Sequence, residues 1–415
     1  MTQSNKSPIF AIVAGEHSGD NYGAMIIRSI KQRYPDATFI GVGGDKMQGE
    51  GLKPLMPMDV LSVIGFVAVI KNIFQLLKAK RQLIKDILSY KPDCYIGIDA
   101  PDFNLRVARA IKKHAFKNNL STKTIQYISP TVWAWRPKRI YTVAKATDLV
   151  LCIFPFEEKI YSDQNIPAKF IGHPLTQILQ PRSFTDKQVS IEKIAQINNN
   201  ISTDSNLKTI GIFPGSRVSE INSLAPIFLQ TVDCLQQKKI NCQFVVPMVS
   251  EKLYHLWLQH CQEVTNSDIV RDKIHVIKLY ETSALTSIDV MKATDLILSA
   301  SGTTTIEAML LNIPMVVAYK VSKLNELLFK LLIKIRYLAM PNILSDKLLG
   351  IKLVPEFLQA DVTVDNLCLA VIEELKKYSH HSTDENWHTL QQYLLADSID
   401  HPGAIRNAVL DLLKI

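Results

Sequence analysis

The sequence predicts an α/β fold of two doubly wound, Rossmann-like domains that face one another across a cleft and are followed by a helical tail. Three observations predict this fold. The 415 residues are enough for two domains that each bury a core of their own. Short apolar runs alternate with amphipathic segments of helix length, which is typical of βαβ units around a parallel sheet. The alternation stops once, near the middle of the chain, and then begins again.

The first domain is expected over residues 1–175. Its strands are predicted, in chain order, at residues 9–14, 38–42, 94–98, 124–128, 149–153 and 169–171. The first twenty residues hold one lysine and a short apolar run that ends in a Gly-containing turn, so they predict a buried strand rather than a signal peptide. We therefore expect the protein in the cytoplasm.

The second domain is expected over residues 208–380, after a linker at residues 176–207. Apolar residues become sparse in the linker, and its run INNNISTDSN is rich in residues that favour turns. The strands of the second domain are predicted at residues 209–213, 243–246, 275–277, 296–298 and 315–318. Residues 381–415 are predicted as a helical tail, and the sequence leaves open whether it crosses back to the first domain or is exchanged with a second copy.

Residues 61–85 interrupt the alternation with an apolar stretch that is followed by lysines and an arginine. The stretch is shorter than the ~20 apolar residues that span a bilayer. It fits an interfacial helix on anionic lipid, and it fits equally a core strand followed by a helix with a solvated basic face. In the first interpretation the residues facing lipid and acyl chains are Val63, Phe66, Val67, Ile70, Phe74 and Leu77.

The composition narrows the classes of partner. The formal net charge of +8 favours anions such as anionic lipid or phosphorylated metabolites. The aromatic-interleaved basic tract typical of nucleic-acid binding is missing, so no nucleic acid is expected. The 6 cysteines are widely spaced without a zinc-binding pattern, and they predict small core side chains in a reducing compartment.

The first candidate motif, GEHSGD at residues 15–20, follows the first strand and opens a helix. Its glycines allow a ligand close to the backbone, and Ser18 or Asp20 can cap the helix so that its amides face the cleft. A helix cap explains Gly19 and Asp20, but it does not explain the carboxylate of Glu16 at the edge of the sheet. Glu16 is therefore a candidate for function, and His17 is a weaker one.

The second candidate motif, GIDAPDFN at residues 97–104, follows the apolar strand CYIGI. Asp99 lies at the carboxyl end of this strand, where a carboxylate with a raised pKa can take a proton from a hydroxyl nucleophile. Asp102 follows a proline at a helix start and is better explained as a helix cap. Asp99 is therefore the preferred candidate base.

A third motif of the first domain, PTVWAWR at residues 130–136, places two indoles beside a guanidinium. Sugar faces stack on aromatic rings, and Arg136 is able to meet a phosphate. Packing of the aromatic side chains between loop and helix explains the same residues equally well.

The second domain carries two motifs that together predict a nucleotide diphosphate site. PGSR at residues 214–217 bends the chain after a strand, and it places Gly215, Ser216 and Arg217 before a helix that Ser219 or Glu220 caps. A salt bridge between Arg217 and Glu220 is the weaker interpretation. SGTTT at residues 301–305 supplies Ser301, Gly302 and Thr303 to a phosphate at a helix start, and Glu307, one turn later, can accept both hydroxyls of a ribose.

At this point the chain resembles a known family. GEHSGD, GIDAPDFN, SPTVWAWRP, FPFE, IGHPL, PGSR, SGTTTIEAML, MPNIL and VPEFLQ occur in the order seen in the lipid-A-disaccharide synthases, over residues 9 to about 410. The resemblance implies the GT-B fold and inverting transfer of diacylglucosamine from UDP-2,3-diacylglucosamine to the 6-hydroxyl of 2,3-diacylglucosamine 1-phosphate. The expected products are the β-1,6-linked disaccharide 1-phosphate and UDP.

The resemblance also implies roles for residues. Asp99 resembles the essential carboxylate of the family and Arg217 its essential arginine, while Glu307, Asn342 and the turn at 301–303 resemble its nucleotide site. Whether Asp99 or Glu16 is the base stays open. The one departure is His17, where the family commonly has a small residue. No DxD cluster accompanies the diphosphate motifs, so no metal and no cofactor are expected.

Three further expectations follow from lipid substrates. Residues 61–85 become the favoured membrane and acyl-chain surface, on the inner face of the cytoplasmic membrane. The helical tail permits a homodimer by exchange of C-terminal segments. The alternatives are a UDP-N-acetylglucosamine 2-epimerase or another GT-B enzyme with a soluble sugar, and a peripheral membrane protein that binds a UDP-sugar without turnover.

Overall fold

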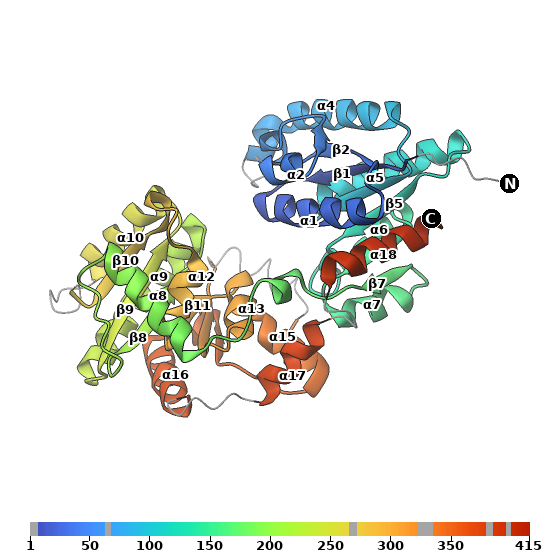
Figure 1. The fold of residues 1–415 in the computed structure, drawn as a ribbon. Helices are drawn as coiled ribbons and strands as arrows, with labels where there is room; N and C mark the ends of the chain where they lie inside the picture. Colours follow the sequence, from blue (N-terminus) through green and yellow to red (C-terminus); the bar gives the residue numbers. More distant parts are fainter. Residues whose placement is uncertain (1–6, 63–67, 265–271, 322–334, 379–384, 396–399) are drawn as a thin grey trace. The chain divides into compact units, whose positions relative to one another are not determined.

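The computed structural model describes residues 7–62, 68–264, 272–321, 335–378, 385–395 and 400–415. The chain divides into two compact units. Unit 1 contains residues 1–177 and 393–415, and unit 2 contains residues 178–392. Each unit is a parallel sheet with helices packed against it, as the alternation in the sequence predicts (Figure 1).

The sheet of unit 1 has seven strands in the order β3-β2-β1-β4-β5-β6-β7. Every pairing between them is parallel. The central strands are apolar along almost their whole length because helices cover both faces of a doubly wound sheet. The strands are β1 (Ile9–Ala14), β2 (Thr38–Val42), β3 (Leu52–Pro54), β4 (Cys94–Ile98), β5 (Lys123–Tyr127), β6 (Leu149–Cys152) and β7 (Ala168–Phe170).

The helices of unit 1 connect these strands and bury one apolar face each. In α5, for example, Leu105, Ala108 and Ile111 follow helical spacing and are buried. The connecting helices are α1 (His17–Arg33), α2 (Asp45–Gly49), α3 (Asp59–Ser62), α4 (Ala68–Ser89), α5 (Pro101–Lys117), α6 (Ile140–Ala146) and α7 (Pro155–Ser162).

The C-terminal residues return to unit 1. There α18 (His401–Leu413), drawn in red, lies beside α1, drawn in blue (Figure 1). The buried ring of His401 bridges the hydroxyl of Tyr127 at 2.9 Å and the carbonyl oxygen of Ile171 at 2.8 Å. The hydroxyl of Ser29 on α1 donates to the carbonyl oxygen of Pro402 at 3.0 Å. Within one chain, the tail thus packs against the first unit through polar and apolar contacts.

The sheet of unit 2 has six parallel strands in the order β10-β9-β8-β11-β12-β13. The strands are β8 (Lys208–Phe213), β9 (Cys242–Met248), β10 (Ile274–Lys278), β11 (Leu296–Ala300), β12 (Met315–Tyr319) and β13 (Glu356–Leu358). The helices are α8 (Phe184–Ile197), α9 (Val218–Gln237), α10 (Glu251–Val264), α12 (Ser287–Lys292), α13 (Thr303–Leu310), α15 (Met340–Leu349) and α16 (Val364–Lys377), and α17 (Glu385–Leu394) leads out of the unit.

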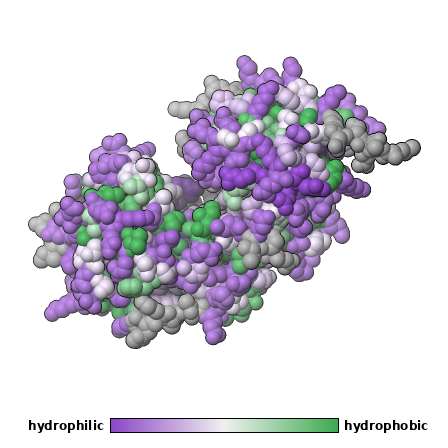
Figure 2. Space-filling model, in the orientation of Figure 1, coloured by the Kyte–Doolittle hydropathy of each residue, from purple (hydrophilic) through white to green (hydrophobic). Residues whose placement is uncertain are grey.

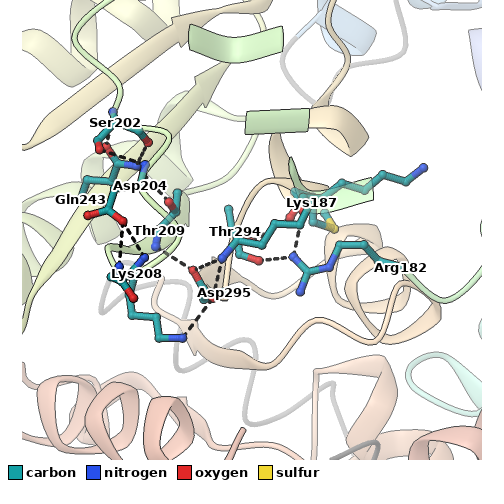
Figure 3. Close-up of polar contacts among 12 residues, drawn as sticks. Arg182, Lys187, Ser202, Asp204, Lys208, Thr209, Gln243, Thr294 and Asp295 are labelled. Atoms are coloured by element: carbon teal, nitrogen blue, oxygen red, sulfur yellow. Dashed lines mark hydrogen bonds and ion pairs between the residues drawn. The ribbon is translucent and has the colours of Figure 1, made fainter. Parts of the chain in front are cut away.

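The stretch predicted as a linker contains α8, which is anchored to unit 2 by two cations (Figure 3). Lys187 binds both carboxylate oxygens of Asp295, at 2.7 and 2.8 Å, and Arg182 donates to the carbonyl oxygens of Lys292 and Thr294. Asp295 also accepts from the backbone N–H of Thr209 at 2.9 Å. Because Thr209 and Asp295 lie at the amino ends of β8 and β11, residues from 182 onward are part of this unit.

Residues 61–85 are partly described. Val63, Phe66 and Val67 lie outside the described residues, and the structure describes Ile70 and Phe74 only by their backbone in α4. Leu77 is half-buried, Leu83 and Ile87 are buried in the core, and Lys78, Arg81 and Lys85 are exposed. The described part of α4 thus has an apolar inner face and a basic outer face.

Two findings concern the surface and the cysteines. None of the described helices combines the length and the apolar composition needed to cross a bilayer. Polar residues cover most of the displayed face of each unit (Figure 2). All six cysteines are free thiols, and Cys94, Cys152, Cys242 and Cys368 are buried as predicted, whereas Cys234 and Cys261 are half-buried.

Candidate functional site

Four of the predicted motifs begin at the topological switch points of the two sheets. In unit 1, β1 pairs with β2 on one side and with β4 on the other. In unit 2, β8 likewise lies between β9 and β11. The segments that leave the carboxyl ends of β1 and β4, and of β8 and β11, therefore start side by side, which is where open α/β sheets bind their ligands. The sequence motifs at 15–20, 97–104, 214–217 and 301–305 are those segments.

Asp99 is held by its backbone in a left-handed conformation. Its φ is 47° and that of Ala100 is 40°, values that L-residues seldom adopt. The carbonyl oxygen of Asp99 accepts the side-chain amides of Asn104 at 2.8 Å and of Gln126 at 3.1 Å, and its N–H donates to Tyr127 at 3.0 Å. The backbone at Asp99 is thus fixed by three hydrogen bonds from two neighbouring elements.

The environment of the Asp99 carboxyl favours its protonated form. Partial burial raises the pKa of Asp99, the negative charge of Glu16 raises it further, and the backbone N–H of Ala100 opposes both effects. Two carboxylates from the segments after β1 and β4 therefore interact across the switch point. A carboxylate with a raised pKa is suited to accept a proton from an attacking hydroxyl.

The residues after β1 divide between the surface and the core. Glu16, His17 and Ser18 are exposed at the start of α1, where no side chain caps the helix. Asp20 is 4% exposed, and its carboxylate accepts from the backbone N–H groups of Gly44, Lys46 and Met47 at 2.8 to 3.1 Å. The prediction that Ser18 or Asp20 caps α1 is wrong, because Asp20 instead caps the start of α2.

The prediction that Asp102 caps its own helix is also wrong. The residue before α5 is Ala100, and no side-chain cap is formed there. Asp102 pairs with Arg139 at 2.5 Å, and Arg139 lies just beyond the 130–136 segment. Since the Arg139 side chain is only 13% exposed, this ion pair connects the start of α5 with the residues that follow β5.

The 130–136 segment presents aromatic and cationic groups. The indole N–H of Trp133 donates to Glu157 at 3.0 Å, and its ring meets Phe156 edge-on with centroids 5.2 Å apart. The exposed guanidinium of Arg136 lies over the Trp135 ring at 4.2 Å. Arg136 is therefore supported by an aromatic ring and exposed to solvent, where its guanidinium is accessible to a phosphate.

The PGSR segment of unit 2 is folded around the carboxylate of Glu220. This carboxylate accepts from the N–H groups of Ser216 at 2.9 Å and Arg217 at 3.2 Å, so it caps α9. Gly215 has a φ of 112°, and a Cβ there would lie 2.3 Å from Glu220, so the tight turn needs glycine. The Arg217 guanidinium pairs with Glu220 at 2.9 Å, although its side chain is 77% exposed. A pair this exposed is weak and leaves the guanidinium available to an anion.

The SGTTT segment leaves a helix start open to a ligand. The hydroxyl of Ser301 donates to the carbonyl oxygen of Leu338 at 2.9 Å, while Gly302 and Thr303 are exposed at the beginning of α13. A Cβ at Gly302 would have no atom within 4 Å. Backbone and helix dipole are thus accessible to a phosphate at α13, whereas the start of α9 is occupied by Glu220.

Glu307 and Asn342 differ in accessibility. Glu307 is half-buried on α13, and burial raises its pKa. Asn342 is 0% exposed, accepts from the N–H groups of Leu353 and Val354 at 2.8 Å, and donates to Glu356 at 2.8 Å. The side chain of Asn342 therefore fixes the backbone after α15, and a role in the nucleotide site would have to be indirect.

Three polar side chains at these sites escaped prediction as site residues: Asn104, Gln126 and Glu157. Their signals in the sequence are one asparagine after a helix start, one glutamine inside an apolar strand and one glutamate in FPFE. Only the fold shows that the first two converge on Asp99 and the third on Trp133. Among the described residues, no three His, Cys, Asp or Glu side chains are grouped as metal ligands would be.

Comparison with known proteins gives a consistent result for the whole chain. Residues 10–401 match the family model described as lipid-A-disaccharide synthetase. The lipid-A-disaccharide synthase of Glaesserella parasuis serovar 5 is 39% identical over 421 residues, covering 100% of both chains. That of Colwellia psychrerythraea is 37% identical over 418 residues, covering 100% of this chain and 98% of the relative.

Solved structures share the fold at much lower identity. The UDP-GlcNAc 2-epimerase from Neisseria meningitidis bound to UDP-GlcNAc has a TM-score of 0.56 at 14% identity, covering 99% of this chain and 100% of that one. The glycotransferase of kitacinnamycin has a TM-score of 0.58 at 13% identity, covering 98% and 99%. Both resemble this chain in fold only, because identities this low establish the fold and not the reaction.

Proposed function

The chain belongs to the lipid-A-disaccharide synthetase family, and from that premise we propose that it transfers diacylglucosamine from UDP-2,3-diacylglucosamine to 2,3-diacylglucosamine 1-phosphate. It is a glycosyltransferase of lipid A biosynthesis with the GT-B fold that the sequence predicts. The observation that carries the proposal is the placement of family motifs at the switch points of both sheets, combined with a family match over residues 10–401.

In the proposed reaction, unit 1 binds the acceptor and supplies the catalytic base. The 6-hydroxyl oxygen of the acceptor attacks the anomeric carbon of the donor, and the hydroxyl proton passes to Asp99. The bond between that carbon and the diphosphate oxygen breaks, and UDP leaves with the electron pair. Attack opposite to the leaving group inverts the anomeric carbon and gives the β-1,6 linkage. Glu16 keeps the pKa of Asp99 raised through its charge.

Unit 2 is proposed to hold UDP. The open start of α13 at Gly302 and Thr303 receives the diphosphate, and Arg217 neutralises the charge that develops on it. Glu307, one turn further along α13, is proposed to accept the ribose hydroxyls. Asn342 is assigned an indirect role, because its buried side chain fixes the backbone near α15.

The donor preference tests this function against a soluble sugar substrate. Purified protein is given UDP-2,3-diacylglucosamine or UDP-N-acetylglucosamine, each with the acceptor, and UDP release is measured. We expect release from the diacylated donor at least about tenfold faster, since its acyl chains supply apolar binding energy. Equal rates, or a 2-epimer formed from UDP-N-acetylglucosamine, would support the epimerase-like alternative instead.

A membrane surface at residues 61–85 is the second part of the proposal. It is supported by the exposed Lys78, Arg81 and Lys85 on α4 and by the lipid nature of both substrates. Vesicles containing anionic lipid should sediment the wild-type protein but not a variant with Val63→Asp and Phe66→Asp. Undiminished sedimentation of that variant would exclude the apolar stretch as the contact, and with it attachment to the inner face of the cytoplasmic membrane through this segment.

A homodimer remains a proposal of the same kind. Exchange of C-terminal segments between two copies would use the packing of α18 on α1 that one chain forms with itself. Size-exclusion chromatography with light scattering distinguishes the two forms, and a monomer at micromolar concentration would exclude the exchanged dimer.

A further inference from the structure

The carboxylate of Glu157 on α7 is buried away from solvent, with 1% of the residue exposed. One of its oxygens accepts the indole N–H of Trp133 at 3.0 Å, and the other accepts the backbone N–H of Phe154 at 3.2 Å. The hydroxyl of Ser129, which hydrogen-bonds to Tyr161 at 3.0 Å, also lowers the pKa of this carboxyl group. Within the described residues no Lys, Arg or His forms an ion pair with it, so its partners are hydrogen-bond donors alone.

Ser129 and Trp133 belong to one irregular stretch of the chain. Ser129 stands directly before the 130–136 segment, and Trp133 is at its centre. The hydrogen bonds within the segment are local, from Val132 to Pro130 and from Ala134 and Trp135 to Thr131. Contacts from outside include the bond of Trp133 to Glu157 at one side and the ion pair of Arg139 with Asp102 at the other, and the buried side chain of Val132 packs in the core.

Aromatic packing gives the Glu157 contact its direction. The Trp133 ring stands edge-on to Phe156, and Phe156 stacks on Phe154 with centroids 5.8 Å apart. The Trp133 indole is thus wedged against α7 with its N–H aimed at the carboxylate. The same segment continues through Trp135, which supports the exposed guanidinium of Arg136.

Keeping a carboxyl group in this place costs free energy. Burial raises the pKa of Glu157 to about 7, against the lowering effect of the donors around it. Cys152 on β6 and Tyr161 on α7 are buried and have raised pKa values, so both stay uncharged. They therefore do not offset the cost of burying the Glu157 carboxylate. A buried carboxylate is weak evidence for stability, so the residue is better explained by the geometry that it imposes.

We propose that Glu157 is a positioning residue that holds Trp133, and with it the 130–136 segment, in the arrangement that binds the phosphorylated acceptor sugar. The inference rests on the proposed function and adds to it the group that sets acceptor affinity without touching the acceptor. Glu157 acts through the Trp133 N–H, and Arg136 at the end of the segment meets the phosphate.

The test compares Glu157→Gln with Glu158→Gln. Both substitutions remove one carboxylate from α7 without changing side-chain size, and Glu158 binds the backbone N–H of Phe170 at 2.9 Å, away from the segment. In Glu157→Gln the amide cannot accept from both Trp133 and Phe154. We expect KM for the acceptor to rise about tenfold, with kcat and the donor KM within about twofold of wild type. Glu158→Gln should leave all three unchanged.

A merely structural role would give a different pattern. Equal losses in kcat, donor KM and acceptor KM, or equal effects of the two variants, would contradict the proposal. Trp133→Phe removes the indole N–H and keeps the carboxylate, so it should raise the acceptor KM in the same way. This variant tests the proposal if Glu157→Gln fails to fold. In a protein that already carries Trp133→Phe, Glu157→Gln should not raise the acceptor KM further. A second rise as large as the first would contradict the coupling of the two residues.

Tryptophan emission separates this inference from the proposed function. The emission of Trp133 is obtained as the difference between each protein and its counterpart carrying Trp133→Phe. We expect this emission to shift in Glu157→Gln and to stay at its wild-type value in Glu158→Gln, whichever sugar the enzyme uses. Unshifted emission in Glu157→Gln would contradict the positioning role. Missing disaccharide in the wild-type assay, with the emission shifted as expected, would contradict only the proposed function.

Discussion

The side-chain amide of Asn104 donates to the backbone carbonyl oxygen of Asp99 at 2.8 Å, and it donates to the preceding carbonyl, that of Ile98, at 3.0 Å. One amide thus holds the last residue of β4 and the first residue beyond it. The left-handed backbone at Asp99 is unfavourable by itself, on the order of 1–3 kcal/mol, and it persists because these bonds over-determine it. The strain lies at the residue that we propose as the base.

Replacing Asp99 tests the base directly. Asp99→Asn keeps the shape of the side chain and removes its ability to take a proton. We expect disaccharide formation to fall about 100-fold to 10,000-fold, because general base catalysis contributes that much. UDP binding, measured by calorimetry, should be unchanged because the residues that we propose to bind UDP belong to unit 2. Turnover at the wild-type rate would remove Asp99 from the catalytic role.

Removing the neighbouring charge should shift the pH profile. The negative charge of Glu16 raises the pKa of Asp99, so Glu16→Gln should lower that pKa. A base is active when deprotonated, and the acid limb of kcat/KM should therefore move to lower pH. Stopped assays between pH 4 and 8 measure the limb. A limb that stays in place, with activity retained, would show that Glu16 does not tune the base; loss of all activity would favour Glu16 itself as the base.

Gln126 should affect kcat although its side chain is buried. Its buried amide donates to the carbonyl oxygens of Asp99, Tyr127 and Ile128. In Gln126→Leu these acceptors lose a donor, and the backbone at Asp99 keeps two of its three hydrogen bonds. We expect kcat to fall about tenfold or more while the donor KM stays constant.

Gln243 offers a matched control in the other unit. It is equally buried and donates to Ser202 and Thr209, at the amino end of β8 and remote from the carboxyl-end motifs. Gln243→Leu should lower the melting temperature but leave the kcat of the folded enzyme unchanged. If both leucine variants lost kcat to the same extent, the effect of Gln126 would be general destabilisation.

Arg217 should be needed for turnover but not for folding. The side chain is 77% exposed and its ion pair with Glu220 is on the surface, so Arg217→Ala should melt within about 2 °C of wild type. We expect kcat to fall at least about 100-fold, because the charge on departing UDP loses its cation. Steady-state assays with both substrates measure the loss, and unchanged kinetics would exclude Arg217 as the leaving-group residue.

The sequence predicted the central sheet of each unit well. The predicted strands 9–14, 38–42 and 94–98 have the bounds of β1, β2 and β4, since buried parallel strands are uninterrupted apolar runs between turns. The short edge strands β3 and β13 were missed, because each has three residues and includes a charged one, so neither forms an apolar run. Helix α8 was missed for a different reason: its anchors Arg182 and Lys187 find their partners more than 100 residues away.

The motifs were predictable and their internal contacts were not. Adjacent parallel strands bring their carboxyl ends together, so the grouping of Glu16 with Asp99 follows from the order of β1 and β4. The partner of a short carboxylate does not follow from local pattern. Asp20 and Asp102 look like caps of their own helices, and each binds elsewhere, at the start of α2 and at Arg139.

The most direct test of the central claim is the product itself. Wild-type protein is incubated with UDP-2,3-diacylglucosamine and 2,3-diacylglucosamine 1-phosphate, and the mixture is followed by mass spectrometry. We expect UDP and a β-1,6-linked tetraacylated disaccharide 1-phosphate in equal amounts, with both formed at least about 100-fold more slowly by Asp99→Asn. UDP released without disaccharide, or no consumption of the donor by the wild-type protein, would contradict the proposed transfer.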